Sequence, residues 1–370
     1  MHHIHFEESS KPIRQPQRRL NPLILEVVRE EITKLLQAGI IYPISDSEWV
    51  SPIQVVPKKG GINVVTNEHR EVFTTRVKNK WRVCIDYRKL NVETRKDHYP
   101  LPFLDQMLER LVGKSHYCFL DGYTGYCQIP IAPQDQKKAT FTCPFGTYVY
   151  RRMHFGLCNA PATFQRCMVR IFSEFIEHCM KVFMDDFTIY GESFESCLHS
   201  LSLALQKCVK CNLVLNFEKC HFMVANGIVL GHIVSKEGIE VDPAKIEVIQ
   251  SLPEPTFVRD IRSFLDHTGF YWRFIHNFSR ISLSLTRLLQ NGVTFHFDEV
   301  CKRAFIELKS ALTSASIVQP PDWSLPFELM CDASHRAVGA VLGHRREKIP
   351  HVIYYASKTL DETQISLHCD

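Results

Sequence analysis

Two short apolar stretches carry aspartates where a buried carboxylate is costly, and they restrict the fold more than any other feature of the sequence. The first, YCFLDGYTGYCQIPI, begins as a buried strand, and Asp121 closes its apolar run. The second, KVFMDDFTIYG, places Asp185 and Asp186 between two β-prone runs and predicts a hairpin with both acids at its turn. Carboxylates in such surroundings need a partner.

A divalent cation would explain why two adjacent carboxylates are kept together, because they otherwise repel each other. If the strand bearing Asp121 pairs beside the hairpin, three carboxylates converge at one sheet edge. Hard oxygen ligands suit Mg²⁺, which retains waters and takes substrate phosphates as further ligands. The pattern therefore favours phosphoryl transfer. Acid pairs also occur at turns without a metal, and this alternative stays open from spacing alone.

Composition excludes several classes of protein. A chain of 370 residues with 45% hydrophobic and 11% aromatic residues is expected to form two or three globular units. It has no apolar run near the ~18 residues that cross a bilayer, and its start lacks a signal pattern, so we expect no membrane association. The fourteen cysteines are dispersed, which favours reduced thiols.

Positive charge is concentrated near the N-terminal third. The net charge is +4, yet Lys58 to Lys96 holds eleven Lys or Arg against four Asp or Glu. Trp81, Tyr87 and Tyr99 lie within or beside this stretch. Such a mixture suits contacts with phosphates and stacking on bases or sugars, although a solvated charged face is an equal alternative.

Local patterns indicate alternating helices and strands. Asn21 and Pro22 cap a helix that stops at Gly39, and strand-like SPIQVVP and KWRVCIDYR follow, separated by a Gly-Gly turn and a polar insertion. Asn159 and Pro161 open a helix with an apolar stripe. Further along, Asp242-Pro243 and Thr256 are expected caps, residues 279–290 and 298–313 are expected helices, and a β-rich tail ends the chain.

Seven ordered blocks then carry a family resemblance. They read VVPKK, KWRVCIDYRKLN, FLDGYTGYCQIPI, FGLCNAPATFQ, FMDD, LNFEKCHF and LGHIVSKEGI. From about residue 11 to 364 the chain resembles the reverse transcriptase of a gypsy-type (Ty3-like) long-terminal-repeat retrotransposon, similar to those of plants. The resemblance implies an α+β right-hand polymerase, with fingers and palm at 1–240 and a helical thumb or connection at 241–322. A partial, β-rich ribonuclease H-like segment at 323–370 would follow.

The resemblance also implies roles for single residues. Asp121, Asp185 and Asp186 would be catalytic and hold two Mg²⁺ ions, with Mn²⁺ as an alternative. The implied nucleotide-binding residues are Lys58, Arg82, Tyr126, Phe155 and Gly156. Tyr126 would exclude ribonucleotides by colliding with a 2′-hydroxyl. The implied template or primer contacts are Gln165, Leu230, Gly231 and His232, and Lys219 is a candidate proton donor to pyrophosphate or an ordinary surface lysine.

The tail FELMCDASHRAVGAVL resembles the opening strands of ribonuclease H, with Asp332 at the position of its first metal-binding acid. Because the resemblance stops before the helix that supplies a further acid, we expect a truncated, inactive ribonuclease H remnant.

Three functions follow from these observations. The leading one is an RNA-directed DNA polymerase that extends a primer on an RNA or DNA template with deoxynucleoside triphosphates. The alternatives are a catalytically decayed nucleic-acid-binding remnant and a viral-type RNA polymerase, which Tyr126 and the blocks disfavour. The expected location is a cytoplasmic retrotransposon particle, with the nucleus as a second site. Oligomeric state has no signal in the sequence.

Overall fold

The computed structural model describes residues 1–370 except 58–61, 67–71, 77–80, 335–336, 362–363 and 365–370. Two compact units divide the chain, and each takes several segments of it. Unit 1 comprises Met1–Leu101, Leu120–Thr188 and Ser202–Cys220. Unit 2 comprises Pro102–Phe119, Ile189–Leu201 and His221–Asp370. The two units do not test the boundaries of the three domains expected from the sequence, which stay a prediction.

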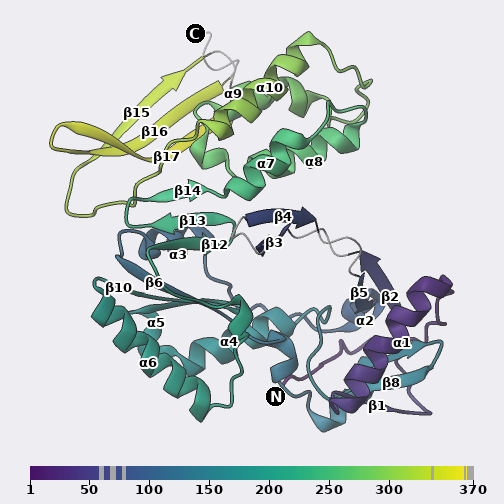
Figure 1. The fold of residues 1–370 in the computed structure, drawn as a ribbon. Coiled ribbons are helices and arrows are strands. Elements are labelled where there is room, and N and C mark those ends of the chain that lie inside the picture. The colour runs from purple at the N-terminus through teal and green to yellow at the C-terminus, as the bar shows by residue number, and fades with distance from the viewer. Residues whose placement is uncertain (58–61, 67–71, 77–80, 335–336, 362–363, 365–370) are drawn as a thin grey trace. The chain divides into compact units, whose positions relative to one another are not determined.

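A five-stranded sheet in the order β1-β8-β7-β2-β5 organises the N-terminal part of unit 1 (Figure 1). Its strands are β1 (Ile41–Pro43), β2 (Ser51–Pro57), β5 (Trp81–Ile85), β7 (Thr140–Cys143) and β8 (Gly146–Tyr150). The strand β2 pairs parallel with β7 and antiparallel with β5. Helix α1 (Pro22–Gln37) buries Val28 and Ile32, and the Asn21 side chain caps it by accepting from the N–H of Leu23. The predicted helix and both predicted strands are therefore confirmed.

The polar insertion between β2 and β5 contains two strands that the sequence analysis did not predict. β3 (Ile62–Thr66) and β4 (Val72–Arg76) pair antiparallel as a separate two-stranded sheet. Their sequences, INVVT and VFTTR, are rich in β-branched residues, which favour strands.

The aspartates lie on or beside a four-stranded sheet in the order β11-β6-β10-β9, of which Figure 1 labels β6 and β10. Its strands are β6 (His116–Asp121), β9 (Met180–Phe183), β10 (Asp186–Gly191) and β11 (His221–Val224). The helices of this part of the chain are α2 (Arg88–Glu93), α3 (Leu104–Leu111), α4 (Ala160–Ile171), α5 (Ser173–Ile176) and α6 (Phe194–Lys210). Phe164 and Phe172, from the predicted apolar stripe, are fully buried. That stripe is therefore core, as expected.

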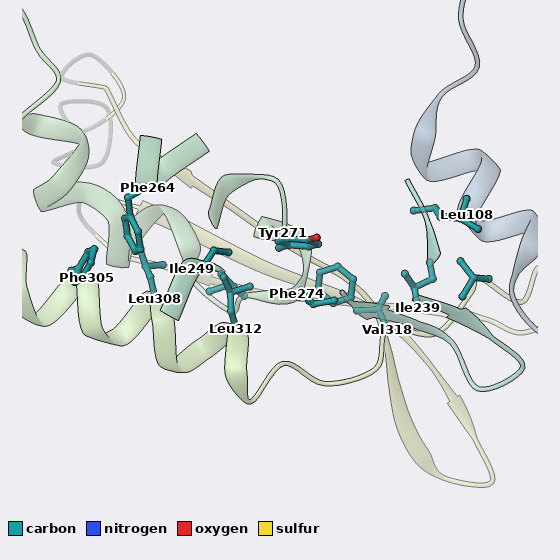
Figure 2. Close-up of a cluster of buried hydrophobic side chains, with 14 of the residues drawn as sticks. Leu108, Ile239, Ile249, Phe264, Tyr271, Phe274, Phe305, Leu308, Leu312 and Val318 are labelled. Carbon is teal, nitrogen blue, oxygen red and sulfur yellow. The ribbon is translucent and has the colours of Figure 1, made fainter. Parts of the chain in front are cut away.

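Unit 2 holds a large apolar core between helices and a small sheet. The sheet consists of β12 (Asn226–Val229), β13 (His232–Ser235) and β14 (Ile239–Val241). The helices are α7 (Pro243–Ser251), α8 (Val258–Gly269), α9 (Phe278–Arg287) and α10 (Glu299–Thr313). In Figure 2 Phe264 of α8 lies against Phe305 of α10, with ring centroids 4.4 Å apart.

The expected helices of this region are confirmed, with one cap corrected. Asp242 caps α7 and Asp298 caps α10 through side-chain hydrogen bonds to backbone N–H groups. The cap of α8 is Phe257, one residue after the expected Thr256. The reason is Asp260, whose carboxylate accepts from the N–H groups of both Thr256 and Phe257 and fixes the start of the helix.

The tail forms a three-stranded antiparallel sheet in the order β15-β16-β17. Its strands are β15 (Phe327–Ala333), β16 (Ala337–Arg346) and β17 (Ile349–Thr359), which confirms the β-rich tail. Taken together, the sheets and helices give the expected α+β fold. None of the helices in the described part of the chain is long and apolar enough to cross a membrane.

Candidate active site

The three aspartates lie on neighbouring strands of one sheet. Asp121 ends β6, Asp185 lies in the turn after β9, and Asp186 begins β10, the strand beside β6. The N–H of Gly122 donates to the carbonyl of Asp185 at 2.9 Å and joins the end of β6 to the turn. Met184 has a φ of 54°, which the tight reversal requires. The hairpin and its pairing beside the Asp121 strand are therefore present as predicted.

The carboxylates influence one another electrostatically. Burial, together with the negative charges of Asp185 and Asp121, raises the pKa of Asp186 to about 6. Nζ of Lys219 lies 3.0 Å from Oδ2 of Asp121 and is the positive charge that opposes this shift. The cluster thus has a surplus of negative charge that one lysine only partly offsets.

The side chains are not arranged as a closed metal cage. In the described part of the chain, no group of three or more His, Cys, Asp or Glu side chains is close enough to hold a metal ion. Asp121 is instead paired with Lys219. The chemistry of the donors still fits Mg²⁺, because three carboxylates whose charge one lysine only partly offsets are hard anionic oxygen ligands. The metal roles of these residues stay a prediction.

Gln165 supports the hairpin from α4. Its side chain is buried, donates to the carbonyl of Val182 at 3.0 Å and accepts from the N–H of Met184 at 2.6 Å. These bonds hold the end of β9 and the turn that follows it, next to Asp185. The expected contact between Gln165 and template is not offered by this conformation, because the amide is engaged and only 1% exposed.

Of the two glycines after β6, Gly125 is the one that lets the chain approach Asp185 closely. A Cβ on Gly125 would lie 3.0 Å from Cβ and 3.4 Å from Oδ2 of Asp185, closer than side chains normally pack. A Cβ on Gly122 would lie 3.5 Å from the Phe187 ring and 3.6 Å from Cβ of Asp185, which is ordinary contact. Only glycine at position 125 therefore leaves the side chain of Asp185 undisturbed.

Tyr126 lies beside the acidic cluster with its ring among other large side chains. Its ring centroid is 6.2 Å from that of Phe155 in a stacked arrangement and 5.5 Å from that of Phe164. Its hydroxyl lies 3.5 Å from Sδ of Met184. Burial and the charge of Asp185 raise the pKa of the phenol, so it stays neutral at physiological pH. The structure thus brings two predicted nucleotide-pocket residues, Tyr126 and Phe155, together near Asp185.

The Phe155-Gly156 turn is held by a residue that the sequence analysis did not single out. The Asn91 side chain donates to the carbonyl of Gly156 at 2.8 Å and accepts from the N–H of Cys158 at 2.9 Å. Gly156 has a φ of 105°, which favours glycine, and Phe155 is exposed. Asn91 belongs to the quoted block KWRVCIDYRKLN, but nothing in its spacing shows that it binds residues 65 positions later.

Gln128 is a second missed support. Its amide donates to the carbonyls of Tyr123 and Val214, both at 2.8 Å, and accepts from the N–H of Val214. The bonds join the segment after Asp121 to the LNFEKC region, where the N–H of Asn216 donates to the carbonyl of Asp121 at 2.8 Å. A glutamine after a Gly-rich turn is the only sequence signal for this role.

Arg82 and Lys58 are the two positively charged residues predicted to bind the incoming triphosphate. Arg82 lies on β5 opposite Val56, with an exposed side chain. Lys58 lies outside the described residues. Their contacts with a triphosphate stay predictions.

Leu230 and Gly231 form the expected tight hairpin turn between β12 and β13 in unit 2. Their φ angles of 48° and 81° are both left-handed, and the hydroxyl of Tyr271 donates to the carbonyl of Gly231 at 2.6 Å. His232 is 1% exposed, and its ring packs among Phe270, Tyr271 and Phe274. The ring of His232 therefore packs against Tyr271, which holds the turn. The primer contact expected of His232 stays a prediction.

Asp332 is exposed on β15, opposite Gly339 of β16. Among the described residues no further acid gathers with it into a metal-binding group. Its predicted metal role therefore has no support from neighbouring ligands.

Two family models match the chain. Residues 56–250 match the model described as reverse transcriptase (RNA-dependent DNA polymerase), and residues 297–369 match the RNase H-like domain found in reverse transcriptase.

Curated relatives cover nearly all of this chain. It is 36% identical over 341 residues to the retrovirus-related Pol polyprotein from transposon 297 of Drosophila melanogaster, covering 92% of this chain and 30% of the relative. It is 33% identical over 353 residues to the Pol polyprotein from transposon gypsy of the same organism, covering 92% and 32%. The Tf2-3 polyprotein of Schizosaccharomyces pombe is 29% identical, with 92% and 24% covered. The chain spans about a third or less of these relatives.

Solved structures share the fold. The foamy viral protease-reverse transcriptase in complex with RNA/DNA hybrid aligns with a TM-score of 0.81 and 21% identity, covering 96% of this chain and 46% of that one. The same viral protein with dsDNA aligns with a TM-score of 0.82 and 21% identity, covering 98% and 73%. At this level of identity, the likeness concerns the fold.

Proposed function

The chain belongs to the reverse transcriptase (RNA-dependent DNA polymerase) family, and on that premise we propose that it extends a primer with deoxynucleotides on an RNA or DNA template. The predicted resemblance to gypsy-type elements is confirmed by the relatives. The observation that supports the activity best is that Asp121 at the end of β6 and Asp185 and Asp186 at the start of β10 lie together, where the charges of Asp185 and Asp121 raise the pKa of Asp186.

Asp121, Asp185 and Asp186 would hold two Mg²⁺ ions, or Mn²⁺ in their place. Such ions, when bound, neutralise phosphate charge and activate the primer 3′-hydroxyl. The chain itself supplies position. Gln165 and Gly122 hold the backbone around Asp185 by hydrogen bonds, and Gly125 leaves room for its carboxylate. Because phosphoryl transfer depends mainly on placement and charge, this rigid support is the protein's main contribution.

Lys219 balances Asp121 before substrate binds. The Lys219 side chain is 66% exposed while that of Asp121 is 19% exposed, so the lysine can leave the pair at little cost in free energy. We infer that Asp121 exchanges Lys219 for cations when the site is loaded. The released ammonium would then be available to an anionic phosphate.

Tyr126 would select the sugar of the incoming nucleotide. Its ring packs against those of Phe155 and Phe164, so a swing away from a 2′-hydroxyl would disturb both contacts. Discrimination by a packed ring is steric, and the deoxyribose is therefore the expected substrate.

The direct test is primer extension on a poly(rA) template with an oligo(dT) primer, dTTP and Mg²⁺. Extension is expected, and it should require the metal. A protein that binds the primed template but adds no nucleotide in either Mg²⁺ or Mn²⁺ would support the catalytically decayed remnant instead. Binding should weaken steeply with salt, because phosphate contacts release counterions.

The ribonuclease H-like segment is expected to be inactive, since among the described residues Asp332 belongs to no group of three or more potential metal ligands. An RNA/DNA hybrid incubated with the chain should stay intact. Cleavage that is lost in Asp332→Asn would show that the segment is a working nuclease. Residence in a cytoplasmic particle stays a proposal, testable by locating the expressed chain in cell fractions.

A further inference from the structure

The hairpin between β16 and β17 places two histidines opposite each other. A two-residue turn at Glu347 and Lys348, with φ angles of 51° and 70°, joins the strands. The antiparallel register pairs His344 with His351, three residues from the turn on each strand. Side chains at directly opposed positions point to the same face, with Cβ atoms about 4.5–5.5 Å apart.

His344 is buried without any hydrogen-bond partner. Its exposure is 1%, and neither Nδ1 nor Nε2 has a partner. Of the residues that the structure describes, His344 alone has two buried side-chain nitrogens in this condition. Burying polar atoms without hydrogen-bond partners is unfavourable, so such a ring calls for an explanation.

The two rings are close enough to share an ion. Their centroids are 6.1 Å apart with the planes inclined by 45°, and His351 is half-buried, so it remains reachable from solvent. Imidazole nitrogens bind zinc at about 2.0–2.1 Å, so two rings at this centroid separation can both reach one ion.

The local charges favour a neutral ring that can act as a ligand. Burial, followed by the positive charge of Arg346, lowers the pKa of His344. The other groups that act on His344 are Asp322, which opposes this shift, and His351. Arg346 is itself paired with Asp322 at 3.2 Å, which offsets its repulsion of a cation. Neutral imidazole is the form that binds metals.

We propose that His344 and His351 form a two-histidine site for one divalent transition-metal ion, with Zn²⁺ as the representative. Imidazole nitrogens suit zinc, nickel and copper rather than the hard Mg²⁺ expected at the aspartates. With two protein ligands, water completes the coordination, so the site is weaker than a four-ligand zinc site. The bound ion would tie β16 to β17. It is independent of the proposed polymerase chemistry.

Hydrogen exchange read peptide by peptide is the suitable test, because thirteen free cysteines elsewhere among the described residues can also take up zinc. ZnCl₂ added to the full chain should slow amide exchange in peptides covering β16 and β17. At zinc about ten times above its dissociation constant, exchange there should slow about tenfold. His351→Gln should abolish this local effect, whereas the exposed His267→Gln should leave it unchanged.

A rescue variant separates ligation from a general loss of packing. His351→Cys supplies a thiolate, which is also a zinc ligand, and should restore protection of the hairpin by zinc. Equal protection in the wild type and His351→Gln would overturn the proposal. So would an absence of hairpin protection with zinc up to about 1 mM, where even a weak site should fill.

Discussion

A Cβ atom placed on Gly125 would lie 3.0 Å from Cβ of Asp185, whereas one on Gly122 would lie 3.6 Å from the same atom. Substitution at Gly125 can therefore be compared with the same substitution at Gly122, three residues earlier on the same segment, as its control. Neither has a left-handed φ, so alanine suits the backbone at both. Only the alanine at position 125 would displace Asp185.

Gly125→Ala should slow primer extension about tenfold or more, because small displacements of reacting groups are costly. Gly122→Ala should retain near-normal extension. The thermal unfolding midpoint of Gly125→Ala should rise less with added Mg²⁺ than that of the wild type, which gives a readout apart from activity. Equal effects of the two substitutions would count against a positional role for Gly125.

Lys219 is expected to compete with cations for Asp121. Lys219→Met should lower, by a few-fold, the Mg²⁺ concentration that half-saturates thermal stabilisation, because it removes a charge paired at 3.0 Å. Lys207→Met is the control, since Lys207 pairs with Glu174 at 3.3 Å elsewhere in unit 1. An unchanged Mg²⁺ requirement in Lys219→Met would show that the ion pair does not restrict the site.

Tyr126→Val should relax sugar selection by removing the ring that is packed between Phe155 and Phe164. The measurement is the ratio of extension efficiency with dATP to that with ATP, which should fall about tenfold or more. Tyr123→Val, at an exposed tyrosine of the same segment, should leave the ratio unaltered. Undiminished discrimination between dATP and ATP in Tyr126→Val would show that Tyr126 does not select the sugar.

Stability should fall on acidification because His232 is buried in its neutral form. Burial, with a smaller contribution from Arg273, lowers its pKa from 6.5 to about 4. Between these values the unfolded chain binds a proton that the folded chain does not, so the free energy of unfolding decreases as pH falls from 6.5 towards 4. At pH 5 the loss from this residue is about 2 kcal/mol.

Chemical denaturation at pH 7 and pH 5 measures this dependence. His232→Phe should reduce the difference between the two pH values, since phenylalanine has no proton to bind and fits among Phe270, Tyr271 and Phe274. The same substitution at the exposed His267 should not reduce it. A difference of equal size in wild type and His232→Phe would assign the acid sensitivity to other groups.

Local chemistry made much of the fold predictable. The helix capped by Asn21, the strand SPIQVVP and the hairpin at Asp185 follow from capping, alternation and turn signals that act over a few residues. The paired strands β3 and β4 were missed, because polar neighbours concealed two short β-branched runs. The cap of α8 was placed one residue early because the controlling carboxylate, Asp260, lies after it.

The site was predictable in its acids but not in its supports. Unpaired carboxylates in apolar runs are visible in a sequence, and they led to Asp121, Asp185 and Asp186. The burial of Gln165 and His232, and the bonds from Asn91 to Gly156, depend on contacts between distant segments. A list of residues does not show which way such side chains point. The pairing of Lys219 with Asp121 likewise emerged only from the structure.

If the carboxylates at the end of β6 and the start of β10 act together on bound cations, Asp185→Asn should abolish nucleotide addition. The measurement is the single-turnover rate of dTTP addition to oligo(dT) on poly(rA), with template binding and thermal unfolding measured on the same protein. The rate should fall at least about a hundredfold while template binding and folding stay intact. A near-normal rate in the folded variant would contradict it.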